Sequence, residues 1–258
     1  MSDLHTERLG DIGLIVMQRP PHNLLSHQQI GQIADAAHDF DSDSNLRAIV
    51  LAADGRSFCA GADIGGSGVG AEDEVIGGPA TRELYRQGAR LFDVQVPIVA
   101  AVQGPAIGGG LGLAVACDFR IASPEARFCA NFSALALHQG FGLSVTLPRL
   151  LGHQKASEVL YTAKRYKGEE ALAIGLADQV VPAEELRDAA IEFAQSIAVN
   201  APLALRAIKA TLRGGLAAEV RAVTDHEAAE QERLSATEDA AEGAASVGER
   251  RPGRFVGR

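Results

Sequence analysis

Hydrophobic residues along the chain form short continuous runs that predict buried strands. Because the runs are continuous rather than alternating, we expect strands buried on both faces of a parallel sheet. Between the runs, apolar positions recur at helical spacing, for example behind Ser26 and Gln29, which resemble a capping box. The pattern predicts an α/β core built from strand–helix crossovers. The predicted strands occupy residues 14–17, 48–52, 98–102 and 119–122.

Strand signals end after residue 181, and amphipathic helices are expected from there to the C-terminus. Residues 186–197 form the first helical stretch, Pro202 begins the second, and residues 217–234 form the third. We therefore predict an α/β core over residues 1–181 and a helical C-terminal region over residues 182–258. Helices that enclose little core of their own often pack between subunits, so an oligomer is expected.

The composition is that of a globular protein rather than of a nucleic-acid-binding or membrane protein. Of the 258 residues, 47% are hydrophobic and 22% are charged, enough to bury a substantial core. The net charge of −9 argues against nucleic acid as a partner. No apolar run approaches the roughly 18–20 residues that span a bilayer, and the first ten residues do not resemble a signal peptide. We therefore expect no membrane span. The three cysteines lack metal-ligand spacing, so we expect no metal. Their odd number and their apolar surroundings indicate reduced thiols and a cytoplasmic location.

Two segments carry candidate chemistry. Residues 56–64 follow the second apolar run and read RSFCAGADI, while residues 99–112 carry the third run into a glycine-rich turn, VAAVQGPAIGGGLG. Glycines 108–110 ahead of a helix leave backbone N–H groups uncovered, where the helix dipole favours negative charge. Taken alone, such a turn more often serves tight packing, and it is also compatible with a phosphate site. It is neither a P-loop nor a dinucleotide-binding fingerprint, because their residues and spacing are missing.

Taken together, the motifs resemble those of the crotonase (enoyl-CoA hydratase/isomerase) superfamily over nearly the whole chain. The segment RPPHNLL at residues 19–25 is similar to the one that borders the coenzyme A site in that family. AGAD at residues 60–63 and GGG at residues 108–110 are similar to its two oxyanion-hole elements. The resemblance implies a spiral of repeated ββα units followed by a C-terminal helical oligomerisation region. Further segments that are similar to the family lie at residues 117–118, at residues 173–177 and 180–182, at Lys209, and over residues 238–258.

By this resemblance, the backbone amides of Ala62 and Gly109 hold the oxygen of an acyl-CoA thioester. Two preorganised donors stabilise the charge that develops there, and losing one typically costs about 3–4 kcal/mol. Coenzyme A enters as part of the substrate with no further cofactor, and the family arrangement is a trimer or a hexamer. Lys209 and the basic tail ending at Arg258 are expected near the coenzyme A phosphates. The remaining residues expected to bind substrate or coenzyme A are His22, Leu24, Ala60, Asp63, Ile64, Phe132, Gln139 and Phe255.

The sequence departs from the family at the two positions where hydratases carry catalytic glutamates. Here these positions hold Gly112 and Phe132. General acid–base groups contribute about 10²–10⁴-fold each, so efficient hydration by the two-glutamate route is not expected. His138 is the best candidate for a replacement, because histidine titrates near neutral pH, although a single histidine is more often structural.

These residues leave several functions open. The leading prediction is an enzyme of the enoyl-CoA hydratase/isomerase type that acts on an acyl-CoA with atypical acid/base residues. A hydrolase or decarboxylase of an acyl-CoA is the alternative within the same superfamily. A decarboxylation forms the enolate without a base that abstracts a proton. A non-catalytic acyl-CoA-binding subunit is the alternative outside enzymes.

Overall fold

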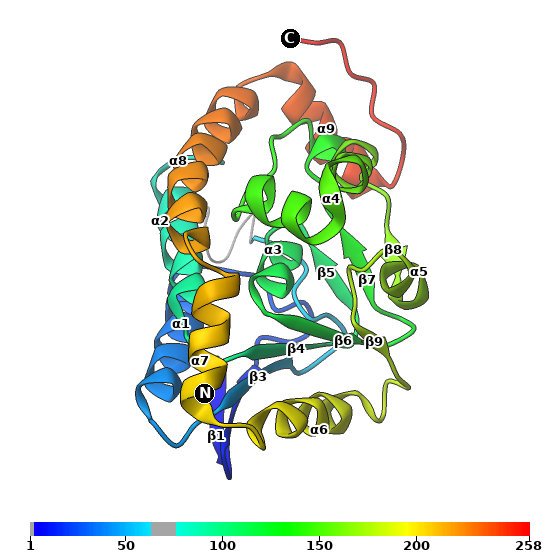
Figure 1. Ribbon diagram of the computed structural model, residues 1–258. Coiled ribbons are helices and arrows are strands. Elements are labelled where there is room, and N and C mark those ends of the chain that lie inside the picture. Colours follow the sequence, from blue (N-terminus) through cyan, green and yellow to red (C-terminus); the bar gives the residue numbers. More distant parts are fainter. Residues whose placement is uncertain (1–2, 63–75) are drawn as a thin grey trace.

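The computed structural model describes residues 3–62 and 76–258, and its main feature is a six-stranded sheet (Figure 1). In spatial order the strands are β1 (Leu4–Leu9), β2 (Ile12–Met17), β3 (Ala48–Ala53), β4 (Ile98–Val102), β6 (Phe119–Ala122) and β9 (Gln179–Val180). Only β1 is antiparallel to its neighbour, and the other neighbouring strands run parallel. A smaller sheet contains β5 (Pro105–Ile107), β7 (Arg127–Cys129) and β8 (Tyr166–Lys167) in that order.

The four strands predicted from apolar runs are confirmed as β2, β3, β4 and β6. Every residue of β2, β3 and β4 is buried, as the continuous runs predicted. The other strands were missed. β1 is a largely exposed edge strand, and the rest contain only two or three residues, which is too few to show a pattern.

Helices cover both faces of the main sheet. On one side lie α1 (His27–Ser42), α2 (Pro79–Ala89), the short helix η1 (Arg90–Asp93) and α3 (Gly109–Ala116), which share one large hydrophobic cluster with the strands. On the other side α6 (Leu186–Ala198) packs against β2, β3, β4 and β6 (Figure 1). The α/β architecture is therefore as predicted.

The predicted C-terminal helices are confirmed as α6, α7 (Pro202–Leu212) and α8 (Leu216–Ser235), and α9 (Glu238–Glu249) was missed. The helix α8 packs on α2 and on α4 (Leu143–Thr162), while α9 packs on η2 (Ser133–Leu135). The short helix α5 (Gly168–Ala173) packs on β7, β8 and β9. Since α6 belongs to the sheet's own hydrophobic cluster, part of the C-terminal region is built into the core. The unit boundary after residue 181 stays a prediction.

The start of α1 forms only half of the expected capping box. The Ser26 hydroxyl accepts a hydrogen bond from the backbone N–H of Gln29 at 3.1 Å. The Gln29 side chain is buried and makes no hydrogen bond with the described part of the chain, so the reciprocal contact does not form. The serine alone caps the helix.

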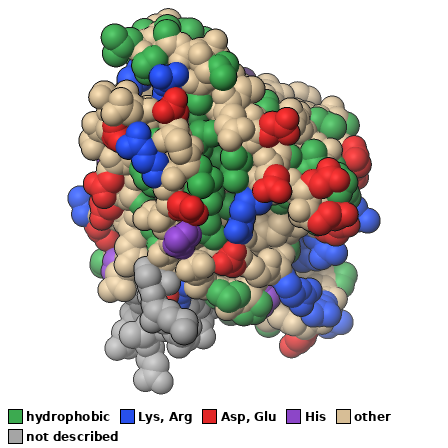
Figure 2. All heavy atoms as spheres, turned by 90° about the horizontal axis from the view of Figure 1, so that it is seen from below, with side chains coloured by type: hydrophobic (Ala, Val, Ile, Leu, Met, Phe, Trp, Pro, Cys, Tyr) green, Lys and Arg blue, Asp and Glu red, His purple; other side chains and the backbone are tan. Residues whose placement is uncertain are grey.

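On one face of the molecule, charged side chains of both signs are mixed rather than gathered by type (Figure 2). Figure 2 shows acidic, basic and hydrophobic side chains interspersed on one face. Within residues 3–62 and 76–258, no helix combines the length and the apolar character needed to cross a bilayer.

Candidate functional site

Two chain segments meet beside the start of α3. Residue Cys59 pairs with β5, because its N–H donates to Pro105 O and its carbonyl accepts from Ile107 N–H, both at 3.0 Å. On the other side, the N–H of Leu25 donates to Gly61 O at 2.9 Å. These bonds hold residues 59–62 against the loop that leads into α3. The contact demands a glycine at position 110, where a Cβ would lie 2.0 Å from Cys59 O.

The backbone amides of Ala62 and Gly109 lie close together at this junction. A Cβ built on Gly109 would lie 4.0 Å from the Ala62 nitrogen. Both residues are partly exposed, and neither amide donates a backbone hydrogen bond to another described residue. Gly109 is the first residue of α3, and Gly108 before it has φ of 55°, a conformation that favours glycine. Two neighbouring N–H groups at a helix N-terminus suit an oxygen atom that carries negative charge.

Apolar side chains line the space next to these amides. The same Cβ position on Gly109 lies 3.8 Å from Leu25 Cδ1 and 3.9 Å from Phe141 Cδ2. Phe141 also covers Gly112, where an added Cβ would lie 2.6–2.8 Å from Phe141 Cβ, Cγ and Cδ1. The ring therefore fills the space that a longer side chain at position 112 would need.

The loop before η2 brings two further residues to the glycine turn. A Cβ on Gly108 would lie 3.0 Å from Asn131 Oδ1 and 3.8 Å from Phe132 Cζ. Phe132 is buried, so its ring packs beside the turn. Position 132 therefore lies beside Gly108, and position 112 faces the Phe141 ring. Neither position carries a titratable group.

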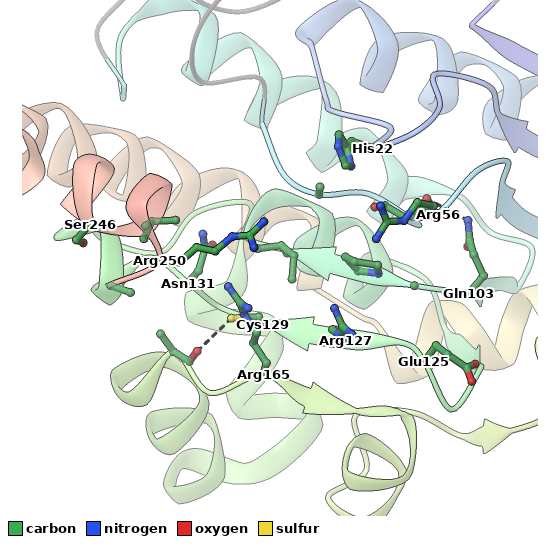
Figure 3. Close-up of a pocket in the computed structure, with 18 of the residues that line it drawn as sticks. His22, Arg56, Gln103, Glu125, Arg127, Cys129, Asn131, Arg165, Ser246 and Arg250 are labelled. Atoms are coloured by element: carbon green, nitrogen blue, oxygen red, sulfur yellow. Dashed lines mark hydrogen bonds between the residues drawn. The ribbon is translucent and has the colours of Figure 1, made fainter. Parts of the chain in front are cut away.

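A pocket of about 990 Å³ opens beside these segments and is strongly basic (Figure 3). The predicted residues His22 and Ala60 line it, and so does Glu125. Four arginines from separate parts of the chain also line it, and none forms an ion pair with a described carboxylate. In Figure 3 they surround one common space. They are Arg56, Arg127, Arg165 and Arg250.

Sequence reasoning anticipated only part of this basic lining. Arg250 and Arg251 of the predicted basic tail do line the pocket, although Arg251 is paired with Glu242 and Glu249. Arg127 and Arg165 were missed, because they lie 38 residues apart in the sequence and are brought together through the pairing of β7 with β8.

The expectation that Lys209 meets a phosphate is wrong for this chain. The Lys209 side chain is 7% exposed, and its Nζ donates to Asp118 Oδ2 and Val96 O, both at 2.7 Å. Arg213 pairs with the other oxygen of Asp118 at 2.9 Å. These contacts give Lys209 a structural role that ties α7 to the start of β4.

His138 and Gln139 lie beside α8 and do not line the basic pocket. The His138 ring packs edge-on against His226 with centroids 5.7 Å apart, and its Nδ1 lies 2.7 Å from Gln139 O. The Gln139 amide donates to Ser144 Oγ at 2.9 Å. The Gln231 side chain donates to His138 O at 2.8 Å, which anchors this loop to α8.

The remaining predicted residues are dispersed. Leu24 lines a separate hollow of about 370 Å³ that also contacts His22. Phe255 is 45% exposed on the C-terminal tail and does not line the basic pocket. Asp63 and Ile64 lie outside the described residues.

The thiols near the site are unsuited to nucleophilic chemistry. Burial raises the pKa of Cys59 to about 12 and that of Cys129 to about 11. Cys129 lines the pocket and donates its S–H to Ala163 O at 3.2 Å (Figure 3). Both are therefore thiols at neutral pH. No cluster of three or more His, Cys, Asp or Glu residues in the described ranges is arranged to hold a metal ion.

Comparisons with known proteins agree with one another. The family model described as Enoyl-CoA hydratase/isomerase matches residues 7–258. A short-chain-enoyl-CoA hydratase of Clostridium acetobutylicum is 33% identical, with 85% of this chain and 84% of that protein covered. A crotonyl-CoA hydratase of Syntrophomonas wolfei is 32% identical, with 97% and 96% covered. Among solved structures, an enoyl-CoA hydratase/isomerase from Pseudoalteromonas atlantica T6c matches with a TM-score of 0.85 at 28% identity, covering 99% of this chain and 100% of that one.

Proposed function

Because this chain belongs to the enoyl-CoA hydratase/isomerase family of enzymes, we propose that it holds an acyl-CoA thioester oxygen between the amides of Ala62 and Gly109. The observation that carries the proposal is the closeness of the two amides, with the Ala62 nitrogen 4.0 Å from the Cβ position of Gly109. Removing a group from the carbon next to a thioester, or adding one to an enoyl thioester, places negative charge on that oxygen. Two fixed N–H donors stabilise this charge.

The basic pocket is the proposed site of the coenzyme A phosphates. The pyrophosphate and the 3′-phosphate together carry about four negative charges at neutral pH. Four arginines without a carboxylate partner among the described residues supply a matching positive charge, and arginine binds phosphate through paired N–H groups. Ala60 lines this pocket and lies two residues before Ala62, so phosphates and thioester are within reach of one molecule.

The proposed reaction does not use the paired carboxylates of the hydratases, since positions 112 and 132 hold glycine and phenylalanine. The apolar wall of Leu25 and Phe141 beside the amides favours decarboxylation as a second candidate. In that reaction the bond to a β-carboxylate breaks, carbon dioxide leaves, and the electron pair moves to the thioester oxygen as an enolate. No base is needed until a proton is returned to carbon. His138 remains the candidate acid or base from sequence, although it does not line the basic pocket.

A panel of enoyl-, β-keto- and malonyl-type thioesters, with coenzyme A products identified by mass spectrometry, tests the reaction class. Turnover of an enoyl thioester that is lost on His138→Ala would assign the acid/base role to His138. Carbon dioxide release from a malonyl-type thioester would support the second candidate. If coenzyme A binds tightly but no thioester reacts, the chain is a non-catalytic binding subunit instead.

Gly109→Ala tests the two amides directly. The added methyl group would make only ordinary contacts, at 3.8 Å to Leu25 and 3.9 Å to Phe141, so the fold should persist. It would, however, occupy the space between the amides, and we expect kcat/KM to fall by about 10²–10³-fold. Gly248→Ala is the matched control, because no atom lies within 4 Å of its Cβ position. Equal activity of the two variants would contradict the proposed oxyanion site.

Replacing Arg165 with alanine tests the phosphate site. We expect coenzyme A affinity to fall about tenfold, with a smaller dependence on salt, because one charge-assisted contact is lost. A pantetheine thioester without phosphates should bind both proteins equally. Arg149→Ala is the control, since Arg149 lies outside this pocket and pairs with Glu219 at 2.6 Å. Equal losses for Arg165→Ala and Arg149→Ala would refute the assignment.

We also propose that coenzyme A arrives as part of the substrate, without a separate cofactor, and that the chain works in the cytoplasm as a homotrimer or homohexamer. Exposed hydrophobic side chains on and beside α7 support the assembly. Light scattering of the purified protein measures it, and a monomeric mass would contradict it. These side chains are Val199, Leu203, Ile208 and Leu212.

A further inference from the structure

We propose that the Phe141 ring closes the acyl end of the site and restricts the substrate to short acyl groups. This inference rests on the proposed acyl-CoA function and adds the size of the acyl group to it. The ring edge lies within 3.9 Å of the Cβ position of Gly109, next to the amides that would hold the thioester oxygen. The carbons attached to that thioester therefore lie near both Phe141 and Leu25, and Phe141 is the larger of the two side chains.

Behind its edge, the ring fills the space between α3 and α2. Its near atoms lie against Gly112 of α3, and its far end lies against Gly88 of α2, where an added Cβ would be 2.6 Å from Phe141 Cζ. Both neighbours are glycines, and any larger residue at either position would clash with the ring. With Phe141 2% exposed, this route between the two helices is closed to an acyl chain.

The ring is held in place from several directions. Phe141 has φ of 60°, unusual for a residue other than glycine, and Gly142 after it has φ of 75°. The N–H of Gly142 donates to the buried Glu227 carboxylate at 2.8 Å. Tyr85 packs edge-on against the ring with centroids 6.2 Å apart, and its hydroxyl donates to Gln231 at 2.9 Å. Moving the ring aside would disturb this network, so Phe141 acts as a fixed wall rather than a gate.

Phe141→Ala should open the space that borders Gly88, Gly112 and Tyr85. Calorimetric titration of butanoyl-CoA and octanoyl-CoA measures the effect as a ratio of the two affinities. Because each buried methylene strengthens binding about fourfold, room for two more carbons should shift the ratio toward octanoyl-CoA by about tenfold or more. Phe141→Leu should give a smaller shift in the same direction. It replaces the alanine variant in the test if that variant does not fold.

Phe92→Ala is the matched control, because Phe92 is buried in the same hydrophobic cluster, while the atoms nearest to Gly88 and Gly112 all belong to Phe141. Its ratio should equal that of the unaltered protein. A folded Phe141→Ala or Phe141→Leu protein with an unchanged ratio would overturn the inference while leaving the proposed function intact. If the unaltered protein binds neither thioester, the proposed function itself fails, and this inference with it.

Discussion

Gly112 and Phe141 are packed so tightly that substitutions at the two positions should depend strongly on each other. The perturbation is Gly112→Ala, which adds a single methyl group at the position predicted from the sequence to correspond to a hydratase glutamate. In the present structure that methyl would lie 2.6, 2.7 and 2.8 Å from Phe141 Cβ, Cγ and Cδ1. Carbon atoms in proteins are best separated by about 3.5–4.0 Å, so the ring would have to move by nearly 1 Å.

The ring has no room to make this movement. Its opposite end already lies against Gly88, and the N–H of the next residue, Gly142, is hydrogen-bonded to the buried Glu227 carboxylate. Overpacking of this kind costs about 1–3 kcal/mol, and the rigid surroundings place Gly112→Ala at about 2–3 kcal/mol. Phe141→Ala alone leaves a cavity and should cost about 3–5 kcal/mol. In the double variant the methyl enters that cavity, so its own cost should fall to about zero and the two changes should couple by about 2 kcal/mol.

Urea denaturation followed by circular dichroism, on the parent and the three variants, gives the four free energies of unfolding that the cycle needs. If the free energy of unfolding falls with urea concentration at the same slope in all four proteins, the comparison concerns stability alone. If Gly112→Ala destabilises the parent and the Phe141→Ala protein equally, the packing explanation for glycine at position 112 is refuted.

Two further predictions concern buried charges. Asp118→Asn should lower the free energy of unfolding by about 3–5 kcal/mol, because it leaves Lys209 buried without its carboxylate. Asp93→Asn, which breaks the exposed pair with Arg221, should cost at most about 1 kcal/mol in the same urea assay, and equal losses would contradict the first estimate. Burial raises the pKa of Glu227 above its ordinary value of 4.5, so the folded protein binds this proton more tightly than the unfolded chain does. The free energy of unfolding should therefore fall as pH rises above 4.5, and this fall should be smaller in Glu227→Gln. If the free energies of unfolding of the two proteins change in parallel from pH 4 to pH 7, the reasoning is wrong.

The fold was predictable wherever burial is continuous along the sequence. The four interior strands, α6 and α8 follow from apolar runs and helical spacing, because each buries a side that the sequence must mark. The helix α7 follows from helical spacing alone, since Lys209 is the one buried residue among Pro202–Leu212. The small sheet was not predictable, since β8 has two residues and its pairing with β7 joins segments that lie far apart in the sequence. The helix α9 was also missed, because its sequence is rich in alanine and glycine and buries only Gly243 and Ser246.

The site was predictable where it is made of backbone and unpredictable where it is made of distant side chains. Residues 60–62 and 108–110 carry local sequence signals, because close backbone approach requires small residues, such as Gly110 under Cys59 O. The arginines at positions 127 and 165 carry no such signal. Their meeting depends on strand pairing between segments that lie far apart in the sequence. The contact between Phe141 and Gly88 also joins segments that lie far apart in the sequence.

The contact between Phe141 and Gly112 also bears on whether a hydratase-like carboxylate can be restored by a single substitution. A glutamate at position 112 would first meet the steric conflict with Phe141, and any arrangement that relieved it would leave the carboxylate against an apolar ring. Burial of that kind favours the neutral acid and raises its pKa, so the group would not be the anionic base that activates water at neutral pH. Removing the ring at the same time would admit water and solvate the charge. Carboxylate chemistry at position 112 therefore requires the exchange of Phe141 as well, and the residue pair determines which chemistry this side of the site can support.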